Sequence, residues 1–340
     1  MQFPDSFFED EVRDGFYVPA LMKRSWAAQM EVLADVARIC EKYQIHWFAD
    51  RGTLLGAVRH GGYIPWDDDL DICMLRDDFN RFMEVAEQEL PKGYFIPKNR
   101  NDNQRLLTSI LYGEPFCLEE NHLYKFHNFP FRTGIDIFVL DYVAPRPEDE
   151  NLRIRLALTV WVAAKEVTPE NQNTEQTLAM LSEFENLFHI TFDHNSSIKE
   201  QLYILLENIF SMYTNSGGTE VAFMPNWVRD RTWSFPLEAY RSSVLIPFEQ
   251  MDVAVPVQYQ EALRIQFGEH YMTPYRAGGG HEYPAYQALE NHLAQVSKGE
   301  FNFLARYWIE DGDWKRKRQN TMIHTQAICP CPEPCLHVNQ

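Results

Sequence analysis

The chain has 340 residues, of which 45% are apolar and 14% aromatic, so it carries enough apolar material for a buried core and is neither disordered nor fibrous. Lysine and arginine total 31 against 49 aspartate and glutamate residues, which gives a net charge of −18 at pH 7. A chain this acidic repels polyanions, so nucleic acid is not among its predicted partners.

The first half of the sequence predicts alternating helices and strands. Apolar residues recur at steps of three and four over 18–43, which predicts an amphipathic helix. A short strand is predicted over 45–48, followed by a turn that opens a short helix over 52–58. Polar and apolar residues alternate over 69–74, which indicates a strand with one wet face, and the helical period returns over 76–90.

The second half of the sequence predicts further strands and then helices. Strands are predicted over 106–112 and 134–140, and helical patterns over 152–166, 175–189 and 197–213. Strand-like alternation returns over 244–257, and helices are predicted over 260–267 and 288–309. The fold class is therefore predicted as α/β (α+β), with a mixed sheet and an added helical segment.

The predicted organisation has five parts, which differ in their patterns. They are an N-terminal helical segment (1–45), a mixed core (46–145), a helical insertion or lobe (146–240), a part that completes the domain (241–312), and a basic tail rich in cysteine and proline (313–340).

The acidic run WDDDLD at residues 66–71 is the most informative motif. Residues two apart in a strand point to the same side, so Asp69 and Asp71 are predicted to hold two carboxylates on one face. Adjacent carboxylates repel each other unless a cation lies between them, and oxygen ligands suit Mg²⁺ or Mn²⁺. Asp67 with Asp69 is a rival pair that fits less well, because the charged Asp68 would take an apolar strand position. The alternative to a metal site is that this run caps a turn.

A small turn, GTLLG at residues 52–56, precedes the acidic run and follows a predicted strand. Backbone N–H groups at a helix N-terminus can hold a phosphate there, which makes Gly52, Thr53 and Gly56 candidate substrate-binding residues. A phosphate-binding turn followed by a strand with Asp-x-Asp is the layout of the polymerase-β-type nucleotidyltransferase fold, which needs a third acid on a neighbouring strand. Asp136, within GIDIF, is the candidate, and the alternative is an acid whose role is structural.

The 25-residue run from Phe48 to Ile72 resembles the signature of the LicD family, which includes bacterial phosphorylcholine transferases and is related to fukutin and fukutin-related protein. Residues 134–141 resemble the second acidic strand of that family, and 266–274 resemble the end of its C-terminal helix. The resemblance covers roughly residues 20–145 and 240–285.

The resemblance implies a metal-dependent transferase with Mg²⁺ or Mn²⁺ and no organic cofactor. A CDP-linked donor such as CDP-choline would give its phosphorylcholine to a glycan of the cell envelope, of the teichoic acid or lipopolysaccharide type, and the acceptor can be lipid-linked. Asp69, Asp71 and Asp136 would be the catalytic and metal-binding residues. Two alternatives stay open: a nucleotidyltransferase acting on a sugar or small acceptor, and a catalytically silent protein that binds glycan or nucleotide.

Cationic and aromatic residues near the motif are candidates for contacts with the donor. Arg51, Arg59 and His60 lie inside the run that resembles the family signature, and Arg59 is the first choice because a guanidinium matches phosphate geometry. Pairing with a neighbouring aspartate is the alternative for each arginine. Trp66 and Tyr63 could stack on a base or enclose a choline headgroup, and packing is their alternative.

The two ends of the chain carry predictions on location. The N-terminal sequence lacks the features of a secretory signal, and the longest apolar run, 156–164, is about half of the ~20 residues of a membrane span, so a cytoplasmic protein without a transmembrane segment is expected. The basic run 315–318 could touch an anionic membrane as a peripheral contact. Whether Cys329, Cys331, Cys335 and His337 bind zinc is left open.

Overall fold

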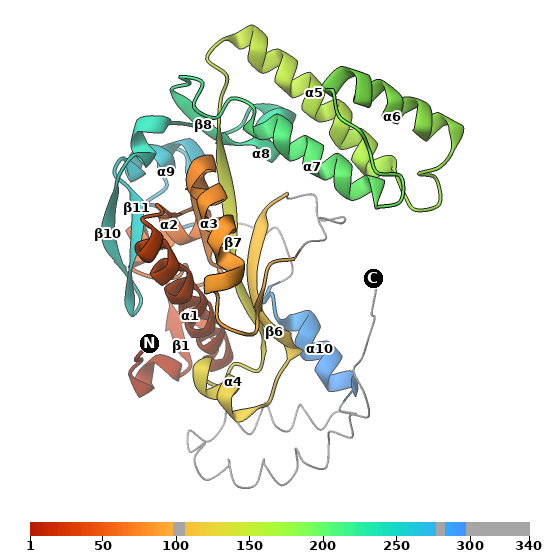
Figure 1. Ribbon diagram of the computed structural model, residues 1–340. Helices are drawn as coiled ribbons and strands as arrows, with labels where there is room; N and C mark the ends of the chain where they lie inside the picture. The colour runs from red at the N-terminus through yellow and green to blue at the C-terminus, as the bar shows by residue number, and fades with distance from the viewer. Residues whose placement is uncertain (98–105, 277–282, 297–340) are drawn as a thin grey trace.

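The computed structural model describes residues 1–97, 106–276 and 283–296, and these residues combine helices with a mixed sheet in an α+β architecture (Figure 1). The strands are β1 (Glu11–Arg13), β2 (Phe16–Val18), β3 (Phe48–Ala49), β4 (Asp71–Leu75), β5 (Tyr94–Phe95), β6 (Thr108–Phe116), β7 (Phe131–Tyr142), β8 (Glu220–Phe223), β9 (Ser234–Pro236), β10 (Ser243–Phe248) and β11 (Met251–Pro256). The helices are α1 (Ala20–Tyr43), α2 (Arg51–His60), α3 (Arg76–Glu89), α4 (Glu120–Lys125), α5 (Pro147–Glu166), α6 (Glu175–Phe188), α7 (Ile198–Ser211), α8 (Met224–Asp230), α9 (Tyr259–Phe267) and α10 (Gln287–Val296), with short 3₁₀ turns η1 (Asp5–Phe8) and η2 (Leu237–Tyr240).

Among the described residues, seven strands form the central sheet, in the order β3-β4-β7-β6-β5, and β8 and β9 extend it. Only β4 and β7 run parallel, and the other neighbours are antiparallel, so the sheet is mixed as predicted. The long strand β7 pairs with β4 along one side. Its other side is shared, because β6 pairs with the first half of β7 and β8 pairs with Leu140 to Tyr142. Strand β7 therefore lies at the centre of the sheet.

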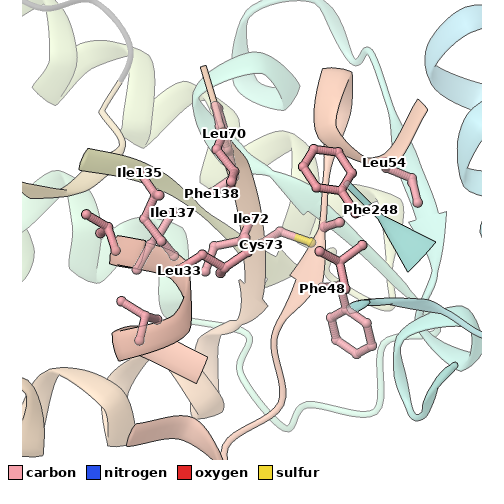
Figure 2. Close-up of a cluster of buried hydrophobic side chains, with 14 of the residues drawn as sticks. Leu33, Phe48, Leu54, Leu70, Ile72, Cys73, Ile135, Ile137, Phe138 and Phe248 are labelled. Atoms are coloured by element: carbon pink, nitrogen blue, oxygen red, sulfur yellow. The ribbon is translucent and has the colours of Figure 1, made fainter. Parts of the chain in front are cut away.

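The two faces of the sheet differ in what they hold. Ile72 of β4 lies opposite Ile137 of β7, and both are fully buried with Leu33 of α1, as Figure 2 shows. Side chains alternate along a strand, so Asp71 and Asp136 point to the opposite face. Helix α2 contacts β4, β10 and α9, which places these elements together around the acidic side of the sheet.

Helices α5, α6 and α7 form a lobe with its own apolar core (Figure 1). The range 146–240 is predicted as a helical insertion or lobe, and in the structure it also contains β8 and β9, which join the central sheet. Arg76, at the start of α3, connects the lobe to the sheet, because its guanidinium contacts both carboxylate oxygens of Asp141 in β7 at 2.7 and 2.8 Å and Glu207 of α7 at 3.0 Å. The lobe and the sheet are thus joined by backbone pairing and by a buried ion pair.

Other predicted elements are confirmed with shifted limits. The N-terminal helix is confirmed, the strand predicted over 45–48 is the two-residue β3, and the strand predicted from residue 69 begins at Asp71. The hairpin of β1 and β2 was not expected. The end of the helix predicted over 288–309, the basic run and the four zinc candidates in the tail lie outside the described residues. In the part of the chain that the structure describes, no helix has the length and apolarity to cross a membrane.

Candidate functional site

Five aspartates gather where β4 begins. Asp71 is the first residue of β4 and lies directly opposite Asp136 of β7 in the parallel register. Paired residues of parallel neighbours project from the same face, so both carboxylates leave the sheet together. The residues just before β4 complete the group, because one carboxylate oxygen from each of Asp67, Asp68 and Asp69 lies within 4.8 Å of the others. We call these five residues the acidic cluster.

The electrostatics of the acidic cluster favour a bound cation. Asp71 is only 7% exposed, and burial, with the nearby charges of Asp69 and Asp136, raises the pKa of Asp71 well above its ordinary value. Carboxylates this close together cannot all be ionised unless a positive charge compensates them. Several carboxylate oxygens in one place are the ligands that Mg²⁺ and Mn²⁺ prefer. The donor set therefore fits the predicted metal.

Hydrogen bonds from other elements fix two of the carboxylates and the start of β4. Ser109 of β6 donates its hydroxyl to Oδ1 of Asp136 at 2.5 Å. The backbone N–H of Asp71 donates to the hydroxyl oxygen of Thr53 at 2.8 Å. The backbone N–H of Ala285 donates to Oδ2 of Asp68 at 2.5 Å, which brings a segment from the far end of the chain to the acidic cluster.

Helix α1 holds the backbone of the acidic run. Trp26 donates its indole N–H to the carbonyl oxygen of Asp67 at 3.0 Å, and Gln29 donates to the carbonyl oxygen of Asp68 at 2.7 Å. The sequence analysis missed Trp26, Gln29 and Ser109 as site residues. Their partners lie many residues away, and only the packing of α1 and the register of β6 against β7 bring them together, so no local pattern indicates them.

The predicted phosphate-binding turn, residues 52–56, is helical in the structure and lies in the first half of α2. Gly52 lies against Asp67, because a Cβ built on Gly52 would overlap Oδ2 of that residue. Thr53 is buried, and its hydroxyl oxygen accepts the hydrogen bond from the backbone N–H of Asp71 at the start of β4. Gly56 lies one turn further along, where a Cβ would overlap the carbonyl oxygen of Gly62. The structure thus places Gly52 and Thr53 beside the acidic cluster and Gly56 against the loop that follows α2.

Arg51 lies next to the acidic cluster, where its positive charge acts on Asp71. Its guanidinium carbon lies 3.9 Å from the ring centre of Phe138, and the rings of Trp233 and Phe223 lie at 5.3 and 5.4 Å. Its Nε is buried and makes no hydrogen bond within the described residues, although Asp50 Oδ2 lies 4.0 Å away. Three rings therefore hold a guanidinium in place while leaving hydrogen-bonding capacity unused.

Arg59 and His60 lie at the C-terminal end of α2. Arg59, the preferred candidate for a phosphate contact, is therefore not at the predicted turn. Arg59 lies seven positions after Gly52, which corresponds to roughly 10 Å along the helix axis. Arg59 donates to the backbone carbonyl of Tyr271 at 2.9 Å, and His60 Nε2 lies 3.2 Å from Asp14 Oδ2. These two side chains hold other segments of the chain against α2.

The two aromatic candidates have different surroundings. Tyr63 is buried and stacks on Trp26 with ring centres 4.7 Å apart and an interplanar angle of 4°, so it belongs to the core and not to a substrate site. Trp66 is half-buried and meets the ring of Phe16 edge to face at 6.2 Å. Of the two, Trp66 alone is placed to contact a substrate.

Comparison with known proteins gives matches over the same region. Residues 44–131 match the family model described as LicD/FKTN/FKRP, nucleotidyltransferase domain, a stretch that carries four residues of the acidic cluster and ends before Asp136. The chain is also 29% identical over 261 residues to the lipopolysaccharide cholinephosphotransferase LicD of Haemophilus influenzae, a match that covers 72% of this chain and 89% of the relative.

Shorter matches extend this result. Uncharacterized proteins of Rickettsia typhi and Rickettsia prowazekii are 40% and 37% identical over 70 and 73 residues, which are 23% and 27% of those proteins. The family model and the long match to a single relative agree with the resemblance noted in the sequence. The chain therefore contains a region that matches the LicD family model and is similar over most of its length to a LicD cholinephosphotransferase.

Proposed function

We propose that this protein transfers phosphocholine, or a similar phosphorylated small group, from a CDP-linked donor to a glycan of the cell envelope. The observation that carries the proposal is the acidic cluster at the N-terminus of α2, in a chain that is similar over most of its length to a lipopolysaccharide cholinephosphotransferase. The polymerase-β-type nucleotidyltransferase fold is part of the proposal, because one acid just before a strand, one acid at its first residue and one acid on the neighbouring strand resemble that layout.

Asp69, Asp71 and Asp136 would hold a divalent cation, and Asp67 is close enough to join them. The donor set is all oxygen, which suits Mg²⁺ or Mn²⁺. Such a cation supplies charge neutralisation for the donor diphosphate and for the phosphorus under attack.

The residues of the chain then have separate roles in the transfer. Arg51 and the first N–H groups of α2 bind and orient the donor phosphates, since both offer donors beside the acidic cluster. Asp136 accepts the proton of the acceptor hydroxyl, with its carboxylate held by Ser109. The acceptor oxygen forms a bond to the distal phosphorus, the bond from that phosphorus to the bridging oxygen breaks, and CMP leaves.

The test is to incubate the purified protein with CDP-choline, CDP-glycerol, CDP-ribitol or nucleoside triphosphates plus Mg²⁺ and an envelope glycan, and to identify the nucleotide released by chromatography. We expect CMP from a CDP-linked donor, and no release when a chelator is present. Attack at the proximal phosphorus would instead leave CMP on the acceptor, and that product would establish nucleotidyl transfer.

Absence of any metal-dependent product from all these donors would refute both transfer reactions. It would favour the catalytically silent alternative. A location in the cytoplasm belongs to the same proposal, because a CDP-linked donor is a product of cytoplasmic metabolism. A lipid-linked acceptor is part of the proposal too, since the relative acts on lipopolysaccharide.

A further inference from the structure

Three aromatic rings from three distant segments meet beside the acidic cluster. Phe16 of β2 contacts Trp66 edge to face at 6.2 Å and Tyr283 edge to face at 5.7 Å. Two of these rings are close to the acidic cluster along the chain. Trp66 directly precedes Asp67, and Tyr283 lies two residues before Ala285, whose backbone N–H donates a hydrogen bond to Asp68. We call Phe16, Trp66 and Tyr283 the aromatic trio.

The aromatic trio already receives a cation in the structure. The guanidinium carbon of Arg276 lies 4.5 Å from the ring centre of Phe16. The charges of Asp68 and Arg276 both influence Tyr283, whose pKa is raised to about 12 mainly by burial and then by Asp68. A positive group thus lies over the ring of Phe16 at this place, near Tyr283 and the carboxylate of Asp68. The exposed Arg276 shows where such a group sits.

The hairpin of β1 and β2 holds Phe16 in position through contacts that do not involve the ring. Asp14, in the turn of the hairpin, approaches His60 of α2 at 3.2 Å. Arg13 donates to Glu249, which also accepts from the backbone N–H of Tyr63 at 3.1 Å. The ring is therefore presented by a fixed segment that lies outside the matched residues 44–131.

We infer that the aromatic trio is the subsite for a quaternary ammonium group on the substituent that is transferred, so that it selects choline over hydroxylated or primary-amine headgroups. Aromatic faces compensate a positive charge without accepting hydrogen bonds, which suits an ammonium that has no N–H. The inference rests on the proposed function. Two carbons separate the ammonium of choline from its phosphate oxygen, which agrees with a subsite directly beside the acidic cluster.

The test measures binding and needs no turnover. Phosphocholine and phosphoethanolamine are titrated calorimetrically into the full-length protein with Mg²⁺, and we expect phosphocholine to bind at least about tenfold more tightly, the range of a desolvated cation–π contact. Phe16→Leu and Trp66→Leu should each remove most of that preference. Tyr17→Leu is the matched control, because Tyr17 is exposed on the same strand and is not part of the trio.

Arg276→Gln gives a second and independent variant, because its exposed side chain is not needed for folding. We expect it to tighten phosphocholine binding severalfold, since the guanidinium no longer competes for the ring of Phe16. Equal affinity for both ligands in the unmodified protein, or weaker phosphocholine binding by Arg276→Gln, would overturn the inference.

Turnover separates this inference from the proposed function. If the protein releases CMP from CDP-choline and CDP-glycerol with equal kcat/KM, the proposed transfer reaction is supported and the proposed ammonium subsite is refuted. If it binds phosphocholine selectively through the aromatic trio but releases no CMP, the subsite stands and the transfer reaction falls.

Discussion

Replacing Gly52 by alanine is expected to lower activity strongly without destabilising the fold. A Cβ at this position would overlap Oδ2 of Asp67, whose side chain can swing away, so the carboxylate must retreat by roughly 1.5 Å to reach ordinary contact distance. A displacement of about 1 Å near the reacting groups costs about 100-fold in rate, and the carboxylate of Asp67 lies close enough to Asp69 for its movement to disturb the metal-binding acids. The φ angle of Gly52 is outside the left-handed region, so alanine should also stabilise the helix by up to about 1 kcal/mol.

The assay compares CMP release and urea unfolding for Gly52→Ala and for Gly56→Ala in the same helix. At Gly56 the added Cβ meets the carbonyl oxygen of Gly62, which is backbone and cannot rotate away, so that variant should lose about 1–3 kcal/mol of stability. The reasoning would be refuted if Gly52→Ala kept the full rate, or if it lost as much stability as Gly56→Ala.

Three further predictions concern charged residues. Asp71→Asn should raise the melting temperature of the metal-free protein at neutral pH, because it removes a carboxyl group whose ionisation is opposed by burial and by Asp69 and Asp136. It should also abolish the upward shift that Mg²⁺ causes, and a retained shift in thermal unfolding would place the metal elsewhere. Arg51→Lys should raise the KM for CDP-choline about tenfold, because an ammonium cannot reproduce the stacked, forked guanidinium, and an unchanged KM would exclude a phosphate contact. Arg76→Met should cost about 3–5 kcal/mol in urea unfolding by leaving Asp141 buried without its partner, whereas Arg146→Gln, in an exposed pair, should cause no measurable change; similar losses in both would contradict the argument.

The sequence was most informative where the decisive pattern is local. Asp71 and Asp136 could be selected because each is flanked by apolar strand residues, and the register of β4 against β7 then brings them face to face. The amphipathic period of α1 predicted its limits to within two residues. Asp69 was expected inside the strand, yet strand pairing begins only at Asp71, and the carboxylate oxygens of Asp67, Asp68 and Asp69 lie together just before it.

Relations between distant segments could not be predicted from periodicity. The aromatic trio joins residues 16, 66 and 283, and nothing in the local sequence of a three-residue strand such as β2 indicates which ring it will meet. Arg59 was preferred to Arg51 on chemistry alone, and the structure shows that helix geometry carries Arg59 away from the acids while three rings hold Arg51 beside them. To predict that Arg51 and not Arg59 lies beside the acids, one would need to know how β7, β8 and the segment around Trp233 pack around the Arg51 side chain.

Strand β8 follows the helical lobe in the chain but pairs with β7 in the central sheet, and this order limits how the protein can be truncated. A fragment that stops before the lobe would leave Leu140 to Tyr142 of β7 with a bare edge, and Arg76 would lose its link to α7. Open edges of this kind recruit other chains, so such a fragment should aggregate and not behave as a minimal enzyme. Truncation studies therefore need to retain residues through β9, even though the family-model match ends at Phe131.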